Sequence, residues 1–171
     1  VVLSIAPAKV VFSGFHSGAT WLVFGGLVFG LGVNRTGLDT RLVRSLLVHF
    51  PKLYIAVIYG VFWIGTALAF IVPSASGRVA VLVPIMAALA KEFGFRANSE
   101  GSNKGRTGLI LAAAMGTMIP AFNILPANVP NMALYGAADS VLDIQLTFAD
   151  YFILNFPVMG FFPLLVYPAI I

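Results

Sequence analysis

The sequence predicts an all-α membrane protein, a polytopic helical bundle with a re-entrant hairpin and a broken transmembrane helix. Three observations support this prediction. The 171 residues are 60% hydrophobic and 9% charged, whereas soluble domains carry about 25% charged residues. The apolar residues fall into long runs separated by short polar segments. Two runs are interrupted by polar, helix-breaking residues, which lipid alone cannot accommodate.

Charge and motif content exclude several other classes. The net charge is +4, and most basic residues fall in two short loops, which favours membrane topology over nucleic-acid binding. The absence of Cys excludes disulfides and thiolate metal sites. The chain contains no HExxH and no GxSxG motif, so we expect no enzyme and no cofactor.

The first third of the chain predicts one spanning helix and one surface helix. Residues 15–34 are apolar over a spanning length, and Trp21 suits the membrane interface. Residues 38–50 are amphipathic, because Arg41 and Arg44 alternate with apolar side chains. We therefore expect a transmembrane helix at 15–34 and an interfacial helix at 38–50.

Residues 53–90 predict a re-entrant hairpin. The apolar run Leu53–Val72 is followed by the polar hexapeptide Pro73–Arg78 and then by the apolar run Val79–Ala90. Twelve helical residues rise about 18 Å, against a hydrocarbon core of about 30 Å. A second arm of that length favours a hairpin that enters and leaves on the same side, with the hexapeptide at its tip.

Residues 107–138 predict a transmembrane helix with a break. The segment 123–131 contains three Asn and two Pro between apolar stretches. Proline removes a helical hydrogen bond and frees a carbonyl group. Such a break persists at membrane depth where it is surrounded by protein or lines a cavity.

The C-terminal part predicts an acidic turn and a last spanning helix. Residues 139–145 form the expected turn, and residues 147–171 the expected helix. Thr147 is its predicted N-cap, with Asp150 completing a capping-box-like arrangement. Three prolines are expected to kink this helix: Pro157, Pro163 and Pro168.

Charge bias predicts the orientation of these segments. The loops 34–52 and 91–106 carry more basic than acidic residues, whereas the loop 139–146 carries two Asp and no basic residue. The first two loops are therefore expected in the cytoplasm and the third outside. Both ends of 53–90 then lie in the cytoplasm, which places the tip and the second break near the middle of the membrane.

The two polar breaks together predict a binding site. Ser74 and Ser76 offer hydroxyl groups, Gly77 permits close backbone approach, and Asn128 and Asn131 offer amides. Helix N-termini attract anions, and freed carbonyl oxygens suit Na⁺. Either break alone favours a simple kink over a site, but two breaks in successive segments favour a site. Two prolines open the second break: Pro126 and Pro130.

Arg78 has three interpretations. An arginine at membrane depth is rare and costs about 2.5 kcal/mol or more. It can pair directly with an anionic substrate. Alternatively, it caps carbonyl groups of the neighbouring break, or its side chain snorkels to the membrane surface.

Several segments resemble, in chain order, the motifs of one transporter family. Thr20–Gly26 and Arg35–Arg41 are similar to its W-L … K-T-G-L-x-x-R segment. Ser74-Ala75-Ser76 stands at the family's Ser-Asn-Thr, ten residues before a proline, here Pro84.

Two further motifs follow downstream. Asn128-Val129-Pro130-Asn131 stands at the family's Thr-Pro-Pro-Asn, and Thr147–Tyr151 with Pro157 is similar to its closing helix. The ordered set covers nearly the whole chain. It resembles the divalent anion:sodium symporter family of solute-carrier-type permeases, in the superfamily that also contains arsenite permeases.

The resemblance implies a specific architecture and activity. The family has two inverted repeats, each with a hairpin and a broken helix, and this chain covers about one repeat. It implies a homodimer in a lipid bilayer, here a bacterial inner (plasma) membrane. It also implies Na⁺-coupled, elevator-like transport of a small anion such as a di- or tricarboxylate or sulfate.

The resemblance also assigns site residues. The Na⁺ site it implies is formed by Ser74, Ala75, Gly77, Ala127 and Asn128. For the substrate anion it implies Ser76 and Asn131, to which we add Pro130 of the same motif and, for its charge, Arg78.

Three departures from the family pattern bear on the substrate. Ala75 replaces an Asn, Arg78 replaces a small residue, and Asn128-Val129 replaces Thr-Pro. They are compatible with a different anion, or with use of Arg78 for charge.

Alternatives remain at this stage. One is an arsenite- or antiporter-type permease of the same superfamily, and another is a non-transporting scaffold built on a truncated repeat. Because the sequence starts without Met and ends in an apolar run, we expect part of a longer protein; a complete small protein is the alternative.

Overall fold

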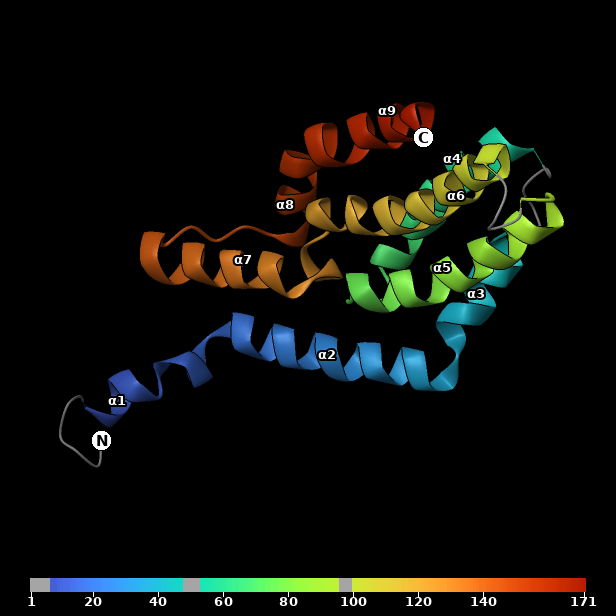
Figure 1. Cartoon of the computed structure of the whole chain (residues 1–171). Helices are drawn as coiled ribbons and strands as arrows, with labels where there is room; N and C mark the ends of the chain where they lie inside the picture. Colours follow the sequence, from blue (N-terminus) through green and yellow to red (C-terminus); the bar gives the residue numbers. More distant parts are fainter. Residues whose placement is uncertain (1–6, 48–52, 96–99) are drawn as a thin grey trace.

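The computed structural model describes residues 7–47, 53–95 and 100–171, and within these ranges every regular element is helical (Figure 1). This confirms the predicted all-α fold. The α-helices are α1 (Ala8–Val11), α2 (Gly18–Thr36), α3 (Leu38–Leu47), α4 (Tyr54–Ala69), α5 (Ala75–Glu92), α6 (Glu100–Met118), α7 (Val129–Leu142), α8 (Phe148–Asn155) and α9 (Phe162–Ile170). The shorter helices are η1 (Ser13–His16), η2 (Pro120–Asn123), η3 (Leu125–Ala127) and η4 (Phe156–Phe161).

Two glycines of helix α2 let its backbone approach Pro73, in the first polar break. A Cβ built on Gly30 would lie 3.4 Å from Pro73, and one on Gly26 would lie 3.6 Å from it. The four-residue spacing puts both glycines on one helix face, so Pro73 packs closely against the backbone of α2. At Gly37, whose φ is 65°, the chain bends by 67° into α3. The predicted end of this surface helix, 48–50, lies outside the described residues.

Helix α6 forms the centre of the core, because both α4 and α5 pack against it. The buried core residues come largely from these three helices. A Cβ on Gly65 of α4 would lie 2.1 Å from the carbonyl oxygen of Gly116 in α6. The two backbones therefore touch, which only glycine permits.

The predicted boundary of the first break is wrong. The chain turns at Phe70–Ser74, and α5 begins at Ala75, so Ala75–Arg78 form the first turn of a helix. With 18 residues, α5 is about 27 Å long. The Ser74 side chain accepts a hydrogen bond from the Gly77 amide, which lets small polar residues start the helix.

Two other predicted boundaries are wrong, because the helices extend beyond the apolar runs. Helix α6 begins at Glu100 instead of 107, and the Tyr54 hydroxyl from α4 donates to the Gly105 carbonyl across 3.2 Å. Helix α7 continues to Leu142, so the predicted acidic turn at 139–145 is helical over its first half. It ends at Asp143, whose φ is 52°, a conformation that Asp tolerates better than most residues.

The last segment confirms the predicted capping box. The Thr147 hydroxyl accepts from the Asp150 amide at 3.2 Å, and the Asp150 carboxylate accepts from the Thr147 amide at 2.9 Å. Pro157 lies within the π-helix η4, which separates α8 from α9. The Tyr151 hydroxyl donates to the Phe122 carbonyl across 3.0 Å, which fixes α8 to the second break.

Two helices of the described ranges are long and apolar enough to cross a membrane, namely Asn103–Asn123 and Phe148–Ile170. The bent pair Thr20–Thr36 and Leu38–Ser45 makes a third if it counts as one span. The re-entrant depth of α4 and α5 and the sidedness of the loops remain predictions. Two of the basic residues behind the sidedness, Lys52 and Arg96, lie outside the described residues.

Candidate functional site

The two polar breaks meet at a single cavity. Figure 1 shows α5 and α7 starting near each other at the centre of the molecule and running in opposite directions. A cavity of about 350 Å³ lies between their N-terminal ends. Its lining residues are Leu27, Pro73, Ser74, Ala75, Ser76, Met118, Phe122, Asn128, Val129 and Pro130.

Both helices that begin at the cavity are capped in the same way. Ser74 Oγ accepts from the Gly77 amide at 3.1 Å, and Asn128 Oδ1 accepts from the Asn131 amide at 3.1 Å. A helix N-terminus carries a positive partial charge and free N–H groups. The cavity therefore receives positive partial charge from two directions, and its described lining contains no carboxylate. This arrangement suits an anion.

Arg78 lies behind this cavity and not in it. Its side chain is 1% exposed, and its guanidinium donates to the carbonyl groups of Val72, Thr117 and Ala127. The distances to the Thr117 and Ala127 oxygens are 3.2 and 3.3 Å. This burial contradicts the snorkelling interpretation, and the geometry matches carbonyl capping. Arg78 is absent from the cavity lining and lies in the supporting wall, and its direct pairing with substrate stays a prediction.

Asn131 also supports the wall. Its side chain is buried, and Nδ2 donates to the carbonyl groups of Ala121 at 2.7 Å and Ile124 at 2.9 Å. These carbonyls are freed where the helix breaks, so the amide donor is used inside the break. Asn131 was predicted to lie near the substrate anion, but it is not among the cavity-lining residues.

The other predicted site residues divide between the lining and its surroundings. Gly77 lines an adjacent cavity of about 220 Å³ against α2, and Ala127 is fully buried. The remaining predicted residues line the main cavity, namely Ser74, Ala75, Ser76, Asn128 and Pro130. Their roles in binding Na⁺ or substrate remain predictions.

Sequence reasoning missed the apolar half of the lining. Leu27, Met118 and Phe122 come from α2, the end of α6 and η2. The glycine pair around Leu27 was a usable signal, because glycines four residues apart mark a close helix contact. It also missed Asn123, whose Nδ2 and Oδ1 are buried without a hydrogen-bond partner among the described residues.

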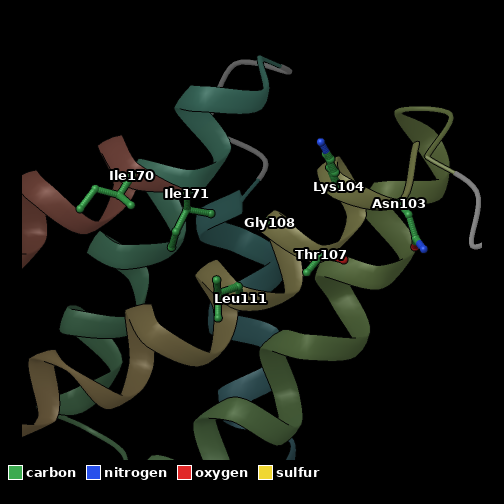
Figure 2. A pocket seen from close by; sticks show the side chains of 7 residues that line it. All are labelled: Asn103, Lys104, Thr107, Gly108, Leu111, Ile170 and Ile171. Carbon is green, nitrogen blue, oxygen red and sulfur yellow. The ribbon is translucent and has the colours of Figure 1, made fainter. Parts of the chain in front are cut away.

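The largest described cavity lies elsewhere and contains none of the predicted site residues. Figure 2 shows this cavity, of about 590 Å³, between the start of α6 and the end of α9. Its polar contributors are Asn103, Lys104 and Thr107, and the Asn103 side chain points away from the opposite wall. The rest of its described lining is apolar or glycine, so its size alone does not make it the functional site.

Comparisons with known proteins agree with the motifs. The family described as "Sodium:sulfate symporter transmembrane region" matches residues 2–171. The chain is 27% identical over 155 residues to the L-tartrate/succinate antiporters of Escherichia coli strains UTI89 and K12, and 26% identical to that of Shigella dysenteriae. The alignments cover 90% of this chain and 32% of each relative, so the chain spans about a third of their length. No solved structure matches.

The family match covers nearly the whole chain and agrees with the ordered motifs, the helical fold and the paired breaks. It is a family of membrane transporters, not of enzymes, as the sequence predicted. The chain belongs to the sodium:sulfate symporter transmembrane family, the divalent anion:sodium symporter group that its motifs resemble.

Proposed function

We propose that this chain forms one substrate-binding half of a secondary transporter for a small anion, such as a di- or tricarboxylate or sulfate. One observation carries the proposal: two capped helix N-termini, at Ser74 and Asn128, open onto the same carboxylate-free cavity. The names of the family and of the relatives support an anionic substrate. A bacterial inner membrane and a homodimeric full-length protein are part of the proposal.

The cavity chemistry explains how an anion is held. Free N–H groups at the starts of α5 and α7, together with the Ser76 hydroxyl, donate hydrogen bonds to oxygens of the anion. Leu27, Met118 and Phe122 form the apolar part of the lining, and a low-polarity wall strengthens electrostatic interactions with a bound anion. Movement of the hairpin and broken helix as one body would then expose the cavity to alternate sides.

The test is uptake by the full-length protein in proteoliposomes. Labelled succinate, tartrate and sulfate are supplied with an inward gradient of NaCl or of choline chloride. We expect uptake of at least one anion, and a raised KM in Ser76→Ala. Folded protein that takes up none of them contradicts the proposal and favours the scaffold alternative.

The Na⁺ coupling that the family implies is part of this proposal. Ser74, Ala75, Gly77, Ala127 and Asn128 are the predicted ligands. Ser74 Oγ and backbone carbonyl oxygens are suitable donors for Na⁺. Uptake that depends on the NaCl gradient supports symport.

A second candidate is anion exchange without Na⁺. The Arg78 guanidinium already occupies the Ala127 carbonyl, which is one of the predicted Na⁺ ligands. The L-tartrate/succinate antiporters among the relatives also favour exchange. Vesicles preloaded with unlabelled succinate distinguish the two: exchange predicts uptake that requires internal anion and is equal in NaCl and choline chloride.

A further inference from the structure

Arg78 is the largest side chain that is fully buried among the described residues, and it connects three separate parts of the chain. The Val72 carbonyl lies in the turn after α4, the Thr117 carbonyl in the last turn of α6, and the Ala127 carbonyl at the end of η3. Carbonyl groups at such ends lack a partner within their own helix. One guanidinium, a planar group with five donors, reaches all three, and the Val72 carbonyl also accepts from the Ser74 amide at 2.8 Å.

These carbonyls are adjacent in sequence to the cavity wall. Val72 precedes Pro73, Thr117 precedes Met118, and Ala127 precedes Asn128. Pro73, Met118 and Asn128 all line the cavity. The guanidinium therefore lies directly behind three segments of the wall and fixes their relative positions.

The charge of Arg78 has no acidic counterpart among the described residues. Its described partners are backbone carbonyls. A buried cation is costly without an opposite charge, and carbonyl dipoles offset only part of that cost. Because a weakly screened charge acts over a longer range than one in water, an anion in the adjacent cavity is attracted to it without contact.

We propose that Arg78 is the positioning residue of the anion cavity, holding three wall segments in register while its fixed charge favours anions of higher valence. The inference rests on the proposed function, since it concerns the same cavity. It adds a residue that acts through the wall, with no contact to the substrate.

The experiment compares Arg78→Lys and Arg78→Gln in the full-length transporter. Both substitutions shorten the side chain and keep a hydrogen-bond donor, but only Lys keeps the charge. Arg44→Gln, at an exposed arginine of α3, is the matched control. The KM for succinate, a dianion, and for monomethyl succinate, a monoanion, is measured in each, together with the melting temperature without substrate.

We expect both Arg78 variants to melt at a lower temperature than the wild type, because neither reaches all three carbonyls. Arg78→Gln raises the KM for succinate by about tenfold or more and that for monomethyl succinate much less, whereas Arg78→Lys keeps the wild-type ratio of the two KM values. Arg44→Gln changes neither the ratio nor the melting temperature. Equal ratios in the Lys and Gln variants overturn the charge role.

Three further outcomes keep the proposal decidable. If Arg78→Gln does not fold, Arg78→Lys decides the charge role alone, and loss of its preference for the dianion overturns it. If the wild type transports neither succinate nor monomethyl succinate but takes up another anion, the ratio of KM values is measured with that anion and its monovalent analogue. If the wild type takes up no anion at all, the proposed function and the charge role both fail. The positioning role is then decided by melting, and equal temperatures for Arg78→Gln and Arg44→Gln overturn it.

Discussion

The first break, at Phe70–Ser74, and the second, between α6 and α7, reach the same end point by different means. At the first, the chain turns sharply, and the Val72 carbonyl accepts from both the Ser74 amide and the Arg78 guanidinium. At the second, the chain passes through two short helices, η2 and η3, and the neutral Asn131 amide satisfies two carbonyls. Each break then ends in a side-chain N-cap with a 3.1 Å hydrogen bond.

The difference shows what a polar break inside a membrane protein requires. Both breaks must satisfy freed carbonyls, because lipid cannot. The short break uses a charged side chain that also reaches across to Thr117 and Ala127, whereas the long break uses a local amide. The two helix N-termini therefore have the same cap geometry, but only the first break contributes a full positive charge, that of Arg78.

The largest effect is expected at the contact between α4 and α6, the two helices that precede the breaks. Gly65 and Gly116 lie close to the ends of α4 and α6, and the Gly65→Ala methyl group would lie 2.1 Å from the Gly116 carbonyl oxygen. The helices must separate, which costs at least about 3 kcal/mol of unfolding free energy. Denaturant unfolding of the purified protein measures this loss, and anion uptake should disappear with it.

Gly32→Ala is the matched control for that substitution. Gly32 lies within α2, and a Cβ there meets nothing within 4 Å. Alanine in place of a helical glycine should stabilise by about 0.5–1 kcal/mol. An equal effect of the two substitutions would contradict the close contact of α4 and α6.

A smaller loss is expected when the amide of the second break is removed. Asn131→Leu leaves the Ala121 carbonyl buried without this donor, whereas the Ile124 carbonyl keeps the Ala127 amide at 3.0 Å. An unsatisfied group costs about 1–3 kcal/mol, so we expect a loss of about 2 kcal/mol in denaturant unfolding. Asn103→Leu, at an exposed asparagine, should stay within about 0.5 kcal/mol of the wild type. If both variants were equally mild, the amide would not hold the break.

The two N-caps at the cavity can be compared with a third cap outside it. Ser74→Ala, Asn128→Ala and Thr147→Ala should each lose about 1 kcal/mol of stability, since each removes one cap. Only the first two should also raise the KM for the transported anion, because Thr147 is exposed and does not line the cavity. A similar KM increase in Thr147→Ala would mean that cap loss acts through general destabilisation.

The smallest expected effect has the opposite sign. Asn123 is fully buried in η2, beside Gly160 of η4, and its amide has no partner among the described residues. Asn123→Leu replaces that unpaired group with an apolar one of similar shape and should stabilise by about 1 kcal/mol, which raises the melting temperature by about 2–4 °C. Asn123→Asp should lower it. Destabilisation by Leu would show that the amide has a partner in the full-length protein.

Much of this architecture could be predicted from the sequence, because hydropathy records which residues avoid water. The all-α class and the Thr147 capping box follow from local patterns alone. The helical state of Ala75–Arg78 and of Glu100–Arg106 could not be predicted, since it accompanies hydrogen bonds to distant segments. Carbonyl capping by Arg78 was one of three interpretations, and the use of the Asn131 amide inside the break was not predicted, because a donor next to a polar break suits a ligand or a carbonyl equally well.

The three carbonyls held by Arg78 also constrain how the protein is made. Their residues lie 6, 39 and 49 positions from Arg78 in the chain, and two of them follow it. When Arg78 is added to the growing chain, Thr117 and Ala127 have not yet been synthesised. Two of its three carbonyl partners therefore become available only after the second break has been made. Full burial of the Arg78 guanidinium is thus a late step that follows the synthesis of α6 and η3.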